Sequence, residues 1–92
     1  MAISGIVKSS VDQSPLAYTT VLKKGTLASV NTDSQGKWIW DGEVNGIQAN
    51  VGDTLVITAP GGYKQKEIIA QQNNITVLEK ETAPPKPPPN GH

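Results

Sequence analysis

Short apolar segments, each ended by turn-forming residues, recur along this chain and constrain its fold more than any other feature of the sequence. Residues 54–59 are the clearest case, because Thr-Leu-Val-Ile-Thr-Ala is followed by Pro-Gly-Gly, which breaks a strand. No window places apolar residues at helical spacing, whereas valine, isoleucine and threonine are frequent. Segments of this kind at intervals of about 8–12 residues are typical of an antiparallel sandwich.

We therefore predict an all-β protein, a seven-stranded antiparallel Greek-key β-sandwich with an extended proline-rich C-terminal tail. The predicted strands are residues 3–7, 19–21, 27–31, 37–41, 54–59, 64–70 and 75–78, and residues 42–53 are expected to form a long connection. The chain has no phenylalanine, so Trp38 and Trp40, which share one face of a strand, would have to fill much of the core. A platform on which sugar rings stack is the alternative interpretation of this pair.

Charge and residue usage exclude several classes of function. The lysines and the acidic residues number eight each, so the chain has no net charge and lacks the basic stripe of a nucleic-acid-binding protein. No apolar run approaches the roughly 20 residues that span a bilayer, so we expect no membrane insertion. Cysteine is absent and the only histidine is His92, which removes thiol chemistry and a Ser-His-Asp triad.

The last ten residues differ in composition from the rest of the chain. Residues 1–82 are predicted to form the sandwich domain, and residues 83–92 a tail or linker that prefers the polyproline II conformation. One interpretation is a solvated spacer, and the other is an anchor that lies in a partner's groove. The candidate partner-binding residues of the anchor are Pro84, Pro85, Pro87, Pro88 and Pro89.

Five short motifs, in order over residues 3–79, resemble the carboxypeptidase-regulatory-like (transthyretin-like, prealbumin-like) β-sandwich family. They are Gly5-Ile6-Val7, Pro15-Leu16, Thr32-Asp33-Ser34-Gln35-Gly36-Lys37-Trp38, Leu55-Val56-Ile57 leading to Gly62-Tyr63-Lys64, and Thr76-Val77-Leu78. The resemblance implies a β-sandwich that serves as a non-catalytic accessory module, because this fold hosts many functions. The length of residues 42–53 and the Pro60-Gly61 interruption depart from the family's pattern.

The motif residues are expected to have structural roles in turns and in the core. Asp33 would accept backbone hydrogen bonds in the turn that it opens, Gly36 would adopt a positive φ, and Trp38 would then point inward. Gly5 would let another backbone approach closely, Pro15 would preset a bend, and Gly62 would lie in a turn. The Tyr63 ring would pack under the sandwich edge, while its hydroxyl reaches solvent or a backbone carbonyl.

Neither acidic pairs nor lysines give a strong signal for chemistry. Asp41 and Glu43 flank a glycine, but a glycosidase needs two acids fixed across a cleft, and the loop after Asp33 lacks the alternating ligands of a calcium site. An isopeptide cross-link from Lys8, Lys23 or Lys37 to Asn31 or Asn50 is a further alternative. We predict a protein that is not an enzyme and that needs no metal or cofactor.

The prediction for function is a structural or interaction module that docks on a larger assembly through protein partners, for example a phage virion component at the head or tail. The first alternative is a periplasmic N-terminal domain of a TonB-dependent transporter or of a secreted enzyme, and the second is a carbohydrate-binding or adhesin module. Residues 1–10 do not resemble a signal peptide. We expect the virion or the host cytoplasm if Met1 is the natural start, and the periplasm or cell surface if the chain is part of a longer exported protein. Self-association through an edge strand is also expected, because copies with no net charge repel each other weakly and an open sandwich presents edge strands that can pair.

Overall fold

The computed structural model describes residues 2–81, and within this range the chain forms strands and no helix. The strands are β1 (Ile3–Ser9), β2 (Thr20–Lys23), β3 (Ser29–Asn31), β4 (Lys37–Trp40), β5 (Glu43–Val44), β6 (Ile47–Gln48), β7 (Thr54–Thr58), β8 (Lys66–Ile69) and β9 (Asn73–Leu78). The prediction of an all-β domain is therefore confirmed. The predicted tail, including all five of its prolines, lies outside the described residues.

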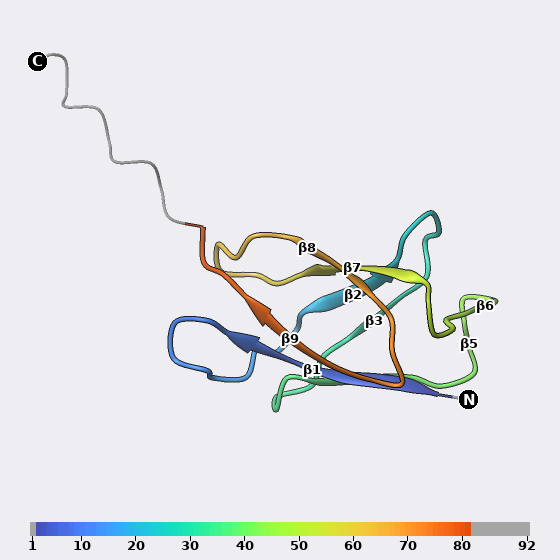
Figure 1. Ribbon diagram of the computed structural model, residues 1–92, viewed down its shortest axis with the longest axis horizontal. Helices are drawn as coiled ribbons and strands as arrows, with labels where there is room; N and C mark the ends of the chain where they lie inside the picture. Colours follow the sequence, from blue (N-terminus) through green and yellow to red (C-terminus); the bar gives the residue numbers. More distant parts are fainter. Residues whose placement is uncertain (1, 82–92) are drawn as a thin grey trace, which may run out of the picture.

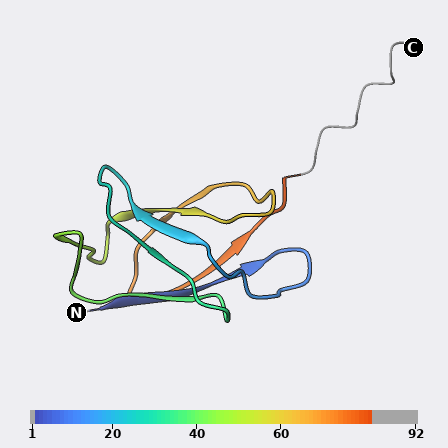
Figure 2. The same ribbon diagram turned by 180° about the vertical axis from the view of Figure 1, so that it is seen from behind.

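Two sheets form the layers of the domain, as Figure 1 and the reverse view in Figure 2 show. One sheet has the strand order β4-β1-β9 and the other the order β3-β2-β7-β8, while β5 and β6 form a separate hairpin. The chain passes between the layers four times: after β1, after β3, after β4 by way of the β5–β6 hairpin, and after β8. Residues distant in sequence thereby become neighbours, above all in the sheet that contains both β1 and β9.

The prediction of an entirely antiparallel fold is wrong, because β1 and β9 are parallel, with Ser4 opposite Asn73 and Ser9 opposite Leu78. The chain leaves β8 and enters the second layer at the end where β1 begins, so β9 runs in the same direction as β1 (Figure 1). β4, by contrast, pairs with the other side of β1 in the antiparallel sense.

The predicted number of seven strands is also wrong, because the stretch 42–53 contains the β5–β6 hairpin. Its turn is Asn45-Gly46, with φ of 51° and 78°. Two successive positive φ angles match the twist of a tight hairpin, and Asn-Gly is the sequence that best tolerates them. The hairpin was therefore readable from the sequence as Asn-Gly between Val44 and Ile47.

The core lies between the layers and follows the alternation of the strands. β4 alternates between exposed and buried residues, so Trp38 and Trp40 both point inward and are only 3% and 1% exposed. The Trp40 indole N–H donates to the Ile47 carbonyl at 3.1 Å, which fastens the small hairpin to β4. Neither indole face is free, so a sugar-stacking platform on this pair is excluded.

Candidate interaction surface

The outer face of the sheet β4-β1-β9 carries an apolar hollow. Inward positions of these strands are buried, and the alternate positions therefore face outward. The strand register aligns the outward residues in two rows, Lys37–Ile6–Ile75 and Ile39–Ser4–Asn73. We call these six residues the outer-face groove.

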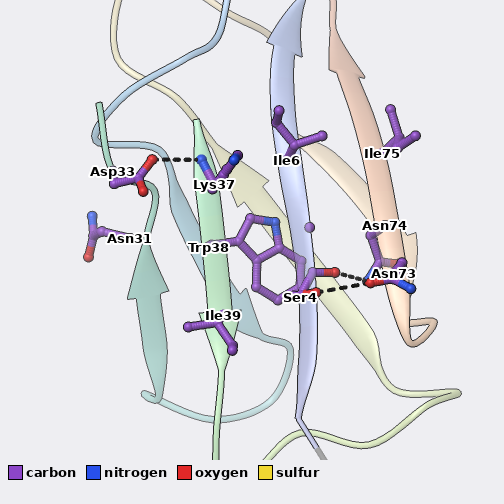
Figure 3. A pocket seen from close by; sticks show the side chains of 11 residues that line it. Ser4, Ile6, Asn31, Asp33, Lys37, Trp38, Ile39, Asn73, Asn74 and Ile75 are labelled. Carbon is purple, nitrogen blue, oxygen red and sulfur yellow. Dashed lines mark hydrogen bonds between the residues drawn. The ribbon is translucent and has the colours of Figure 1, made fainter. Parts of the chain in front are cut away.

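The outer-face groove combines an open position with apolar side chains. The hollow measures about 640 Å³, and Asn31 and Asp33 add to its rim beside β4. Ile75 is 77% exposed and Ile39 is 58% exposed. Figure 3 shows Ile6 and Ile75 side by side on neighbouring strands, with Ile39 further along β4. Exposed isoleucines gathered in a hollow, rather than scattered singly, are characteristic of a surface that another molecule covers.

The polar side chains of the groove are held in place from within the sheet. The Ser4 hydroxyl donates to Asn73 Oδ1 at 3.1 Å, and the Asn74 amide donates to the Ser4 carbonyl at 2.9 Å (Figure 3). Asn74 also closes the turn before β9, because its side chain bonds both backbone groups of Gln71. The start of β9 is thus fixed against β1, which preorganises one side of the groove.

Trp38 lies beneath the groove, on the inner face of the sheet. A Cβ atom added at Gly5 would lie 2.6 Å from Trp38 Nε1 and 2.8 Å from the Asn74 carbonyl oxygen. Glycine at position 5 therefore lets the indole ring lie flat against β1. The Trp38 indole N–H is buried and has no hydrogen-bond partner within residues 2–81. The sequence predicted that another backbone approaches Gly5 closely, and the structure shows both the backbone of Asn74 and the ring of Trp38 at this position.

The turn before β4 sets the rim of the groove. Asp33 Oδ1 accepts hydrogen bonds from the backbone N–H groups of Gln35 at 2.8 Å and Lys37 at 3.0 Å. These hydrogen bonds hold the pKa of the Asp33 carboxyl below its ordinary value. The bond from the Lys37 N–H contributes most to this lowering, and the bond from the Gln35 N–H contributes next. Gly36 has φ of 73°, and its backbone lies against Val7. The turn therefore fixes the position at which β4 begins.

The other residues singled out from the sequence lie away from the groove. Pro15 forms an isolated bridge with Lys8, and Gly62 has φ of 83° in the turn before Tyr63. The Tyr63 hydroxyl donates to Ser9 Oγ at 2.9 Å, so its partner is a side chain rather than the expected solvent or backbone carbonyl. Tyr63 thereby joins the end of β1 to the segment before β8.

Besides Asp33, the side chains of Asp12 and Asp53 are engaged in turns, and those of Asp53 and Glu67 in ion pairs. Asp53 accepts a hydrogen bond from the Asn50 N–H, and its carboxylate lies 3.2 Å from the Lys23 ammonium. Both contacts lower the pKa of the Asp53 carboxyl, and the Asn50 hydrogen bond contributes most. The Ser14 hydroxyl and N–H lower the pKa of Asp12 in the same way. Within residues 2–81, no three metal-ligating side chains gather in one place. No helix in this range is long and apolar enough to cross a membrane.

Sequence reasoning missed the outer-face groove, although part of its signal was present. Ile39 stands between two tryptophans, and Ile75 between Asn74 and Thr76, so apolar residues occur in outward as well as inward positions. A strand with one face in solvent normally has polar residues there. The departure from this rule in two strands marks the face that the structure brings together.

Comparisons with known proteins support the fold of the domain. No protein-family model and no curated protein matches the sequence. The structure is similar to a chain in a crystal structure of a type II cohesin–X-dockerin complex from Acetivibrio cellulolyticus, with a TM-score of 0.58 and 20% identity. The match covers 85% of this chain and 56% of that chain. The likeness shows a shared β fold, while membership of the carboxypeptidase-regulatory-like family stays a prediction.

Proposed function

We propose that this chain is a non-catalytic interaction module that binds a protein partner through the outer-face groove. The observation that carries the proposal is the hollow of exposed isoleucines, whose lining contains only two charged residues, Lys37 and Asp33. An apolar patch with a polar rim is the composition of protein–protein contact surfaces. The lining of this hollow and of a second one beside β9 supports the non-catalytic part of the proposal, since it contains a single acidic residue, Asp33, rather than a pair.

The partner in this proposal is part of a larger assembly, and our first candidate is a phage virion. A second setting, an accessory domain of a longer exported protein, is favoured by one observation: the structural match spans only 56% of the longer chain that it matches. Mass spectrometry of purified virions separates the two. Stoichiometric recovery of this chain from particles supports the virion, and its recovery only from an envelope fraction, joined to further domains, supports the second setting.

Site-specific photo-crosslinking tests the groove itself. A photo-reactive residue at Ile39 should cross-link to the partner inside the intact assembly. The matched control is the same residue at Leu27, which is 89% exposed but lies outside the groove, in the connection between β2 and β3. Equal cross-linking from both positions, or none from Ile39, would show that the groove is not the contact surface.

A further inference from the structure

We propose that β9 is a self-association edge, at which two copies of this chain pair antiparallel about a two-fold axis through Ile75. The pairing would join the two β4-β1-β9 sheets into one continuous sheet of six strands. The inference does not rest on the partner proposed for the groove, because it is argued from the backbone groups on the free side of β9, although Ile75 and Asn73 also belong to the groove.

The backbone of β9 has one side that no other strand uses within the described residues, since β9 ends its sheet. The N–H of Ser4 donates to the Gln72 carbonyl at 3.1 Å, and that of Ser10 to the Leu78 carbonyl at 2.9 Å. Bonds of a parallel ladder fall on alternate residues, so the even-numbered residues of β9 face β1. The backbone groups of Asn73, Ile75 and Val77 consequently point toward the free side.

The open length of this edge is limited at both ends. After Val77 the edge is covered, because the Lys64 N–H donates to the Glu79 carbonyl at 2.9 Å and Tyr63 bridges Lys80. Before Asn73 the chain arrives from β8. The open stretch is therefore residues 73–77, whose middle residue is Ile75. A two-fold pairing that uses the whole stretch must place Ile75 opposite Ile75 of the second copy and Asn73 opposite Val77.

The side chains of β9 suit a second copy of the same strand. Residues 73–78 contain no charge, whereas β8, at the edge of the other sheet, carries Lys66 and Glu67. Charged residues on an edge strand normally prevent such pairing. Ile75, 77% exposed in the single chain, would pack against its own copy. With no net charge on the chain, the two copies do not repel each other.

A buried hydroxyl gives an independent reason for a strand at this position. Thr76 is 2% exposed, and its Oγ1 has no hydrogen-bond partner within residues 2–81. It lines a hollow of about 310 Å³ beside β9, together with Ile68, Ile69 and Gln71 among others. The two-fold register about Ile75 places Asn74 of the second copy opposite Thr76, on the same face of the sheet. The Asn74 carboxamide oxygen has room for a second hydrogen bond and supplies the acceptor.

One contact must be replaced when the copies pair. The Lys66 ammonium donates to the Val77 carbonyl at 3.3 Å, on the open side of β9. In the dimer the N–H of Asn73 from the second copy donates to the Val77 carbonyl in place of Lys66. The Lys66 side chain, which is exposed on β8, then turns into solvent. A long, exposed lysine makes a weak bond of this kind, so its displacement offers little resistance.

Sedimentation analysis of the full chain tests the proposal over about 10 µM to 1 mM, where weak strand pairing populates dimers. We expect the mass to rise from 9.7 kDa toward twice that value. Ile75→Lys should raise the dissociation constant on the order of 100-fold, because like charges would face each other across the axis. Ile39→Lys is the matched control, at 58% exposure on the same face but on the opposite edge strand, and should dimerise normally.

A charge-swap pair tests the register. Ile75→Lys and Ile75→Glu should each be monomeric, and an equimolar mixture should dimerise, since the two side chains would meet across the axis. A monomeric wild-type chain at about 1 mM, a dimer that Ile75→Lys leaves intact, or a mixture that stays monomeric would each overturn the proposal. Circular dichroism melts confirm that each variant is folded. Failure of the groove proposal would show separately, because Ile39→Lys would then leave partner binding unchanged.

Discussion

Position 36 requires both a positive φ angle and the absence of a Cβ atom, and only glycine satisfies both requirements. Its φ of 73° is disfavoured for residues with a Cβ, and an added Cβ would lie 2.6 Å from the Val7 carbonyl oxygen. The same position donates its N–H to the Asp33 carbonyl and accepts from the Val7 N–H. One residue thus holds the turn before β4 and anchors it to β1.

Comparison with a second glycine separates these two constraints. Gly42 has a similar φ of 71°, but an added Cβ would meet nothing within 4 Å. Gly42→Ala should lower the free energy of unfolding by about 1–2 kcal/mol, from the backbone conformation alone. Gly36→Ala should cost about 2–4 kcal/mol, because the clash is added. Urea unfolding measures both, and equal losses would refute the close contact with Val7.

Asp33 gives the turn a dependence on pH. Because the pKa of its carboxyl is lowered in the folded protein, the ionised form favours folding. This contribution is present above the ordinary aspartate pKa and is lost as the pH falls through the lower folded value. The stability difference between wild type and Asp33→Asn should therefore shrink from pH 6 to pH 2. Asp41→Asn serves as the comparison in the same titration, and a difference that stays constant with pH would contradict this account.

At the scale of the elements, β1 is the strand on which the outer sheet depends. It pairs with β4 on one side and β9 on the other, and Gly5 is opposite both Trp38 and Asn74. A glycine in the middle of a strand weakens it unless something needs the space. Here the indole ring of Trp38 fills that space, so the glycine is part of how β1 and β4 pack.

A double-mutant cycle can measure this packing. Gly5→Ala should destabilise the protein by about 1–3 kcal/mol, because the new methyl group overlaps the Trp38 ring. In a Trp38→Leu background the overlap with the ring is relieved while the contact with the Asn74 carbonyl oxygen remains, so the same substitution should cost less, by a coupling that exceeds the usual error of additivity. Thermal and urea unfolding of the four proteins provide the data. Additive effects would show that Gly5 and Trp38 do not share the space.

The elements also show which parts of the fold are readable from sequence. The buried strand β7 follows from its continuous apolar run, and the inward tryptophans follow from the alternation of β4. The Asn45-Gly46 hairpin was equally readable and was missed because its two strands are only two residues long. The parallel pairing of β1 with β9 was not readable, because it depends on where the chain enters the layer after β8. The outer-face groove depends on that pairing, since Ile6 and Ile75 meet only in the folded sheet.

At the scale of the whole molecule, the two interaction surfaces share one sheet. The groove spans its outer face, and the proposed dimer edge is its last strand, so Ile75 belongs to both. A dimer would place the two grooves on one continuous sheet. Two-fold symmetry would then present two equivalent binding surfaces to an assembly, which raises avidity without any new contact.

The core formed by the described residues gives a prediction for a chain that lacks the rest. Within residues 2–81, the buried apolar residues lie between Ile3 and Leu78. At the end of the described residues, the Glu81 N–H donates to the Gly62 carbonyl at 2.7 Å. A variant that ends at Glu81 should therefore keep the melting temperature and the urea midpoint of the full chain, because it loses no residue of the core.

Partner binding decides between the two interpretations of the proline-rich segment. If residues 83–92 anchor the domain in a partner's groove, the shortened variant should bind the assembly more weakly while its stability is unchanged. If they are a spacer, replacing Pro84, Pro85, Pro87, Pro88 and Pro89 by serine should leave binding intact, because length rather than sequence would matter. A drop in melting temperature on removal of residues 82–92 would contradict both, since it would mean that the segment packs on the sandwich itself.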